Sequence, residues 1–255
     1  MRSASVGQQC VECVREGSRS SRAARTAFGG RPVSGAVVTW VLVGLNVLVL
    51  LISLANSNVI VDLEMFGYAA VAPGGAMQGV AAGQWYRLVT SAFTTPGVSG
   101  IGFMDILFNM WALIFVGPSL EKMLGRSRYL SLYLLSAIGG SVLYYWMVAG
   151  NQPAAGASGA IFGLFGAWFV VSKRLRLDSR GIVLLIVINL AFSFIYHSTI
   201  AWQDHIGGLV TGALVTAAFV YAPRKNRTAI QIAAGVAMLA ILVIATVLRS
   251  HQLTS

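Results

Sequence analysis

Long apolar stretches are the feature of this sequence that most limits its fold. A helix needs about 20 mainly apolar residues to cross a hydrocarbon core about 30 Å thick. Charged residues make up only 10% of the chain, whereas a soluble domain carries about 25%. The sequence therefore predicts a multi-pass integral membrane protein, an all-α helical bundle in the lipid bilayer. Seven crossings are expected, at about residues 36–55, 103–118, 129–149, 157–172, 181–197, 203–222 and 229–248.

The second and fourth of these crossings are short, and they contain Asn109 and Ser158. Polar side chains inside a membrane usually face the interior of a bundle, where other side chains can bond them. We therefore expect these two crossings to lie inside the bundle.

The chain has a net charge of +10. Its basic residues lie between the crossings and are not gathered on one soluble face, so no nucleic-acid partner is expected. Basic residues form four groups: those of the tail up to Arg31; Lys122, Arg126 and Arg128; Lys173, Arg174, Arg176 and Arg180; and Arg224, Lys225 and Arg227. All four fall on one side of the predicted bundle, which the positive-inside rule makes cytoplasmic. The prediction is a plasma (inner) membrane protein with its N-terminus in the cytoplasm and its C-terminus outside.

The chain divides into three predicted regions: a basic cytoplasmic tail (1–35), a six-helix core (36–222), and a seventh transmembrane helix with a short tail (223–255). The tail lacks the apolar core of a cleaved signal peptide, so the first crossing is expected to be a retained anchor. Cys10 and Cys13 have the C-x-x-C spacing that can present two thiolates to zinc. Two ligands do not complete a tetrahedral site. A zinc half-site and a flexible tail with two reduced thiols both remain open.

Ser158 and His205 are the side chains best suited to chemistry. A histidine inside a crossing is costly and usually marks a function or a polar partnership, and it can accept a proton from a serine nucleophile. Small residues follow each of them at intervals of four: Gly159, Gly163 and Ala167, and Gly208, Gly212 and Thr216. If these stripes face each other, the helices approach closely, and both side chains come to the same outer end. The alternative is a structural hydrogen bond between two helices.

Four local sequences add a family resemblance: GASGAIFG at 156–163, DHIGGLVTG at 204–212, FNMWAL at 108–113 and QWYRL at 84–88. Together they resemble the rhomboid family of intramembrane serine proteases. Its G-x-S-G motif matches Gly156, Ser158 and Gly159, and its H-x-x-G-x-x-x-G motif matches His205, Gly208 and Gly212. The resemblance covers about residues 36–222 and implies a six-helix rhomboid-like core, to which the family sometimes appends a seventh helix.

The resemblance implies a Ser158–His205 dyad that cuts single-span membrane proteins at or near the outer end of their transmembrane helix. It implies no cofactor and no metal in the active site. Asn109 and Gly156 would support the oxyanion, and Phe162 stands where the family often has a tyrosine stacked on the histidine. Asp204 is not expected to complete a triad, because helix neighbours point about 100° apart. We expect it to be a residue of the helix start.

Asp105 departs from the family, which commonly has a histidine oxyanion donor at this position. Three interpretations are open: Asp105 is protonated and donates, it turns away, or the protein is a weakened protease. The last would favour a rhomboid-like protein that binds membrane clients. A small transporter or channel is a further alternative, but the sequence lacks the repeated broken helices of such proteins.

Several other polar residues have structural explanations. Trp85 and Arg87 match the family's W-R element, in which Arg87 would hold the outer loop through backbone or carboxylate contacts; the alternative is an interfacial anchor. Glu121 is expected to be a solvated charge, and Asn189 to make an interhelical hydrogen bond.

Overall fold

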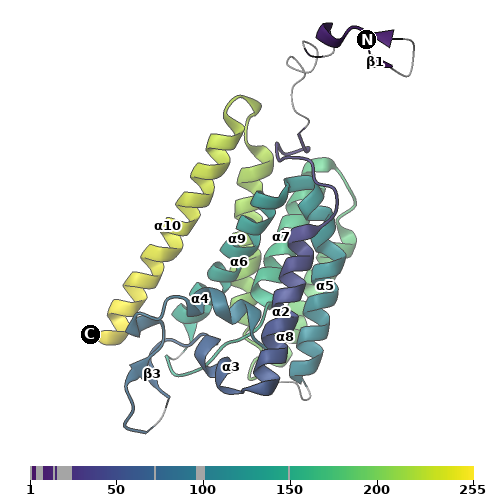
Figure 1. Ribbon diagram of the computed structural model, residues 1–255. Helices are drawn as coiled ribbons and strands as arrows, with labels where there is room; N and C mark the ends of the chain where they lie inside the picture. The colour runs from purple at the N-terminus through teal and green to yellow at the C-terminus, as the bar shows by residue number, and fades with distance from the viewer. Residues whose placement is uncertain are drawn as a thin grey trace.

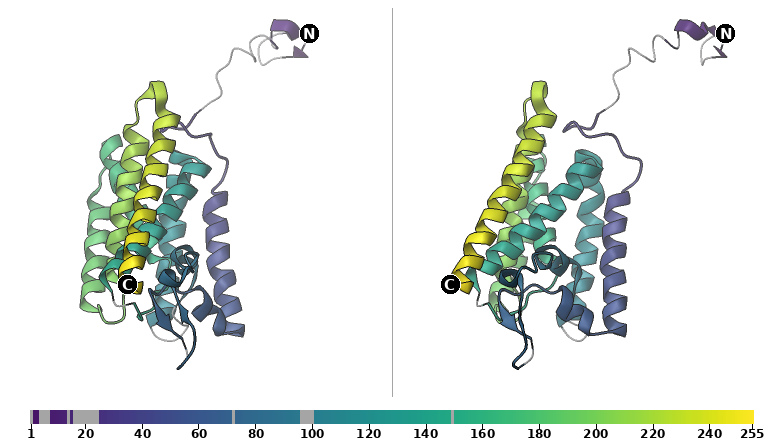
Figure 2. Two further views of the ribbon diagram at one scale, coloured as in Figure 1. Left: turned by 90° about the vertical axis from the view of Figure 1, so that its left-hand side faces the viewer. Right: turned by 60° about the vertical axis from the view of Figure 1, so that its left-hand side comes forward.

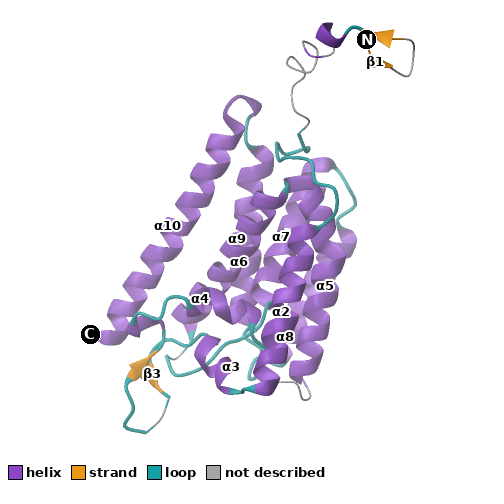
Figure 3. Cartoon of the chain, viewed as in Figure 1, coloured by secondary structure: helices purple, strands orange, loops and turns teal. Residues whose placement is uncertain are grey.

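The computed structural model describes residues 2–3, 8–13, 15, 25–71, 73–95, 101–148 and 150–255. A helix occupies each of the seven predicted crossing positions: α2 (Val37–Ala55), α5 (Ile101–Leu124), α6 (Arg126–Met147), α7 (Ser158–Leu175), α8 (Arg180–Ile195), α9 (Trp202–Tyr221) and α10 (Arg227–Thr254). Among the described residues, five of these are long and apolar enough to cross a membrane, namely α2, α5, α6, α9 and α10. The described residues thus form a mostly helical bundle (Figures 1 and 3).

The second predicted crossing was placed too short. It was expected to end at Pro118, but α5 runs on to Leu124 and is 24 residues long. A proline inside a helix removes one backbone hydrogen bond, which packing against neighbouring helices can offset. Leu120 and Leu124 beyond it are fully buried, so packing continues the helix past the proline.

α7 and α9 pack against each other along their glycine stripes, as the sequence predicts. A Cβ on Gly208 would collide with the carbonyl oxygen of Gly159, and one on Gly212 would collide with that of Gly163. α6 joins them, because a Cβ on Gly139 would collide with the Thr211 side chain of α9. The three helices form the tightly packed centre of the bundle.

Short elements fill the segment between α2 and α5: α3 (Asn58–Leu63), β3 (Ala69–Ala70), β4 (Met77–Gln78), η1 (Val80–Ala82), α4 (Arg87–Thr90) and η2 (Ser91–Phe93). β3 and β4 pair antiparallel. Arg87 is 1% exposed, and its Nη1 donates to the carbonyl oxygens of Val61 and Glu64 at 2.7 and 2.8 Å. The expected backbone contacts of Arg87 are therefore confirmed.

This segment also fixes the loop that leads into α7. Met65 and Ala154 exchange backbone hydrogen bonds of 2.9 and 2.7 Å, and the amides of Gly67 and Tyr68 both donate to the carbonyl oxygen of Gly150 at 2.8 Å. The start of α7 is consequently held by contacts with residues far away in the chain.

Glu121 is not a solvated charge, and that prediction was wrong. It lies inside α5 with no exposed surface. Its carboxylate accepts hydrogen bonds from the amides of Val38 and Thr39 at 3.0 and 2.9 Å and from Thr39 Oγ1 at 2.9 Å. α2 has no side-chain cap of its own at Ala36. Glu121 thus satisfies the first-turn amides of α2 from a different helix.

We expect Glu121→Ala to lower the free energy of unfolding by about 2–4 kcal/mol, because a buried amide, a partly buried amide and a hydroxyl lose their acceptor. Denaturant unfolding in detergent micelles measures the change. Lys122→Ala, at the exposed neighbouring position, is the control and should change stability by less than about 0.5 kcal/mol. Equal effects of the two substitutions would contradict the capping role.

The two ends of the bundle differ. Residues 25–36 and the α9–α10 connection, which contains η3 (Arg224–Asn226), lie at one end, while the C-terminus of α10 lies at the other (Figure 1). In Figure 2, α10 crosses the front of the bundle in the left view and lies at its left edge in the right view, while α2 lies at the right edge in both. α10 packs on α6 and α9. In the tail, β1 (Arg2–Ser3) pairs with β2 (Gln8–Gln9).

Candidate active site

Ser158 is the first residue of α7 and is half-buried. At a helix start the first amides have no partner within the helix and can bind an anion. Gly156, two residues earlier, has a φ of +138°, a conformation that side chains disfavour. Its amide donates to the carbonyl oxygen of Ser91 at 2.9 Å, so Gly156 gives the site its backbone shape, while its N–H is already engaged.

His205 lies in the first turns of α9 and is 6% exposed. Its imidazole stacks on the Phe162 ring of α7, with centroids 4.3 Å apart and planes 11° apart. The close contact between α7 and α9 therefore holds the imidazole against an aromatic ring on the helix that begins with Ser158.

Ser193 of α8 is a residue that the sequence reasoning missed. Its Oγ lies 2.8 Å from His205 Nδ1 and 2.7 Å from the carbonyl oxygen of Asn189, to which it donates. A serine hydroxyl has one proton, so it accepts the Nδ1–H of His205. Nε2 is then the nitrogen with the free lone pair, as a general base requires. The only sequence signal was a hydroxyl four residues after Asn189 in an apolar helix.

Asn189 itself does not bridge helices, and that prediction was wrong. Its Nδ2 donates to the carbonyl oxygen of Leu185 at 2.8 Å, within α8. Its backbone carbonyl is the more important group, because it accepts the hydrogen bond of the Ser193 hydroxyl and so determines the direction of the Ser193–His205 hydrogen bond.

Asp204 is the third residue of α9, whose N-cap is Ala201. Its carboxylate packs into the space left by two glycines: Asp204 Cγ lies 3.0 Å from a Cβ built on Gly140 of α6 and 2.7 Å from one built on Gly159 of α7. Asp204 is thus a residue of the helix start, as expected, and its carboxylate packs against α6 and α7.

Asn109 and Asp105 of α5 reach the same place as Ser158. Asn109 is 5% exposed, and its Nδ2 donates to Asp105 Oδ2 at 3.0 Å. Asp105 Oδ2 and Ser158 Oγ each lie 3.5 Å from the point where a Cβ of Gly156 would be. Asp105 and Ser158 therefore both border Gly156. The three interpretations of Asp105 stay predictions.

In the described part of the chain, no group of three or more His, Cys, Asp or Glu side chains could hold a metal ion. Cys10 and Cys13 are exposed free thiols. The zinc half-site that their spacing suggests stays a prediction.

Comparison with known proteins identifies similar chains. The Rhomboid domain family model matches residues 82–222. "Putative rhomboid protease YdcA" of Bacillus subtilis (strain 168) is 36% identical over 197 residues, which is 75% of this chain and 91% of that protein. "Rhomboid protease GluP" of the same organism is 42% identical over 144 residues, which is 54% of this chain and 27% of that longer protein. "RHOMBOID-like protein 4" of Arabidopsis thaliana is 34% identical over 122 residues, 45% of this chain and 30% of that protein.

Proposed function

Because the chain belongs to the rhomboid family of intramembrane serine proteases, we propose that Ser158 and His205 form a dyad that hydrolyses a peptide bond in a membrane protein. The observation that carries the proposal is the environment of His205. Stacking on Phe162 fixes the ring, and Ser193 engages Nδ1, so Nε2 is available to take a proton from a serine.

In the proposed reaction, Ser158 Oγ attacks the scissile carbonyl carbon while His205 Nε2 removes the proton of the Ser158 hydroxyl. The amide of Ser158 and the second N–H of Asn109 Nδ2 donate to the developing oxyanion. His205 then gives the proton to the leaving amine, and a water molecule, activated in the same way, hydrolyses the acyl-enzyme. Asp105 Oδ2 accepts a hydrogen bond from one N–H of Asn109 Nδ2 and so orients the carboxamide.

The proposed architecture follows the family: residues 36–222 form the six-helix core, and α10 is the additional transmembrane helix. We propose that the N-terminus lies in the cytoplasm and that Ser158 lies toward the outer side of the plasma (inner) membrane, which the distribution of the basic segments supports. Single-span membrane proteins are the proposed substrates. A helical substrate hides its carbonyl groups in hydrogen bonds, so the segment must unwind near the outer end of its helix before Ser158 can attack.

Ser193 is the other hydroxyl beside His205, and it is a poor candidate for the nucleophile. It is 2% exposed, and its hydroxyl already donates a hydrogen bond to the backbone carbonyl of Asn189. Ser158 is half-buried and stands at a helix start where unpaired amides can stabilise an oxyanion. We therefore assign attack to Ser158 and positioning of the imidazole to Ser193.

A fluorophosphonate probe tests this assignment, because it reacts covalently with an activated serine. We expect mass spectrometry of the digested protein to find the adduct on the peptide that contains Ser158 and to find none on the peptide that contains Ser193. His205→Ala should remove the labelling, since the base is lost. An adduct on Ser193 in the wild-type protein would overturn the assignment.

Asp105 supports a second candidate, a rhomboid-like protein that binds membrane clients without cutting them. An ionised carboxylate near Ser158 would repel an oxyanion, and loss of one oxyanion donor can cost about a hundredfold in rate. The same probe separates the candidates. A folded wild-type protein that binds a transmembrane peptide but takes up no probe is the result expected of a client-binding protein.

A further inference from the structure

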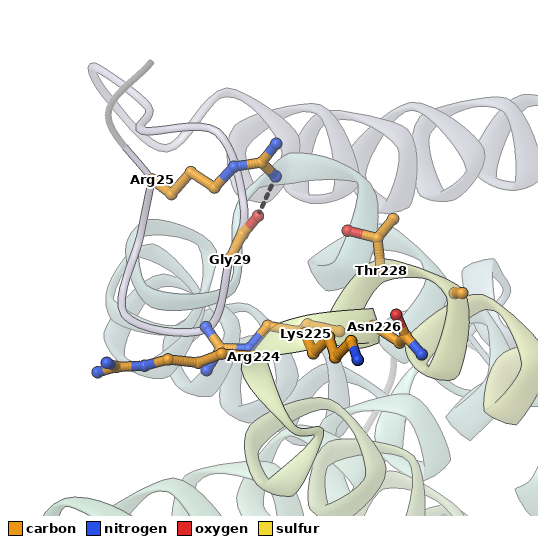
Figure 4. Close-up of a pocket in the computed structure, with 8 residues that line it drawn as sticks. Arg25, Gly29, Arg224, Lys225, Asn226 and Thr228 are labelled. Carbon is orange, nitrogen blue, oxygen red and sulfur yellow. Dashed lines mark hydrogen bonds between the residues drawn. The ribbon is translucent and has the colours of Figure 1, made fainter. Parts of the chain in front are cut away.

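A pocket of about 570 Å³ lies at the end of the bundle where the α9–α10 connection is found. Three parts of the chain line it: the N-terminal segment, η3 and the first turn of α10 (Figure 4). The lining residues are Arg25, Gly29, Arg224, Lys225, Asn226, Arg227, Thr228 and Ala229. None of the proposed catalytic residues takes part in it.

Hydrogen bonds between distant segments build this pocket. Arg227 Nη1 of α10 donates to the carbonyl oxygen of Ala27 at 3.3 Å. Gln231, which is 3% exposed, donates to the carbonyl oxygen of Phe28 at 3.1 Å and accepts from Arg128 Nε of α6 at 2.7 Å. The N-terminal segment is thereby tied to α10 and, through Gln231, to α6.

The lining is strongly cationic. Among the described residues, the lining contains four basic side chains, those of Arg25, Arg224, Lys225 and Arg227, and no carboxylate. Arg25 and Arg227 bond backbone carbonyls, but Arg224 and Lys225 have no hydrogen-bond or ion-pair partner among the described residues. Like charges that line one pocket favour an anionic ligand.

The start of α10 adds donors to the same pocket. α10 runs for 28 residues, and the amides of Thr228 and Ala229 in its first turn have no acceptor within the helix. The positive end of the helix dipole also favours an anion here. The pocket therefore combines cationic side chains with backbone N–H donors, which suits the oxygens of a phosphate group.

An apolar surface continues from the pocket along α10. Ile232 and Val236, within the next turns of the helix, are 61% and 62% exposed. A free phosphate would gain nothing from this surface, whereas the acyl chains of a lipid would cover it. Basic pockets at the cytoplasmic ends of transmembrane helices bind the headgroups of anionic lipids.

We propose that this pocket binds the phosphate of an anionic phospholipid headgroup, with the acyl chains lying along α10. The bound lipid connects residues 25–29 with the α9–α10 connection at one membrane surface. This site is independent of the proposed catalytic residues.

The test measures binding of a fluorescent short-chain phosphatidylglycerol to the purified full-length protein in uncharged detergent, by anisotropy. Each basic residue near a lipid headgroup contributes about 1 kcal/mol, or about fivefold in affinity. We expect the double variant Arg224→Gln/Lys225→Gln to bind at least about tenfold more weakly. Phosphatidylcholine, whose headgroup is neutral overall, should not compete.

Arg176→Gln/Arg180→Gln is the matched control. Both residues are exposed and belong to another basic segment, and their replacement removes the same two positive charges. We expect it to change the affinity less than about twofold. An equal loss in both double variants would show that the lipid responds only to total charge and would overturn the site. If inorganic phosphate at millimolar concentration displaced the fluorescent lipid as effectively as unlabelled phosphatidylglycerol does, that result would identify a phosphate site and overturn the lipid assignment.

Discussion

Replacing Ser158 by alanine should lower the rate of substrate cleavage by at least about a thousandfold, because the reaction loses its nucleophile. Replacing Ser193 by alanine should lower it only about ten- to a hundredfold. Without Ser193, His205 keeps its stacking on Phe162 but loses the acceptor that holds the proton on Nδ1. The ring then spends part of its time in the tautomer that cannot accept the serine proton.

A fluorescent reporter that contains a single transmembrane segment measures both rates in liposomes. His205→Ala should fall to the same residual rate as Ser158→Ala, and the double variant should be no slower, because residues that act as one unit are not additive. Ser193→Thr retains the hydroxyl and should restore most of the wild-type rate, as a positioning role requires.

The opposite pattern would reverse the two roles. If Ser193→Ala reached the residual rate and Ser158→Ala still cleaved the reporter, Ser193 would be the nucleophile. Thermal unfolding of each variant in the same liposomes, followed by tryptophan fluorescence, excludes loss of structure as the cause of a lost rate.

Much of the bundle could be predicted because membrane helices leave local signals in the sequence. Length and hydrophobicity locate α2, α6, α8 and α9 to within three residues, whereas α10 runs six residues beyond its predicted end at 248. The intervals of four among the glycines identify which faces of α7 and α9 meet. These signals arise within one helix, so a single sequence contains them.

Contacts between helices left weaker signals. Glu121 looks solvated beside Lys122, but its partners Val38 and Thr39 lie more than 80 positions away, and only the packing of α2 on α5 brings them together. Ser193 looks like any hydroxyl in an apolar helix until α8 and α9 place it beside His205. Partners on other helices depend on the tertiary arrangement, which hydrophobic patterning does not determine.

Gly208→Ala should strongly destabilise the protein, because Gly208 lies at the close contact between α7 and α9. The added methyl group meets the carbonyl oxygen of Gly159, a backbone atom that cannot rotate away as a side chain can. We expect the free energy of unfolding to fall by about 3 kcal/mol, at the upper end of what overpacking costs. Gly235→Ala on α10 is the matched control. A Cβ there has nothing within 4 Å, and alanine should stabilise the helix by up to about 1 kcal/mol.

Cleavage distinguishes the role of this contact in function from its role in stability. α7 carries Ser158 and α9 carries His205, so a methyl group that separates the two helices also separates nucleophile and base. A displacement of about 1 Å can cost about a hundredfold in rate. We therefore expect Gly208→Ala to lower the reporter rate about a hundredfold even at a temperature at which the variant is fully folded. A folded variant with the wild-type rate would show that the glycines set only stability and that the dyad does not depend on how closely the two helices approach.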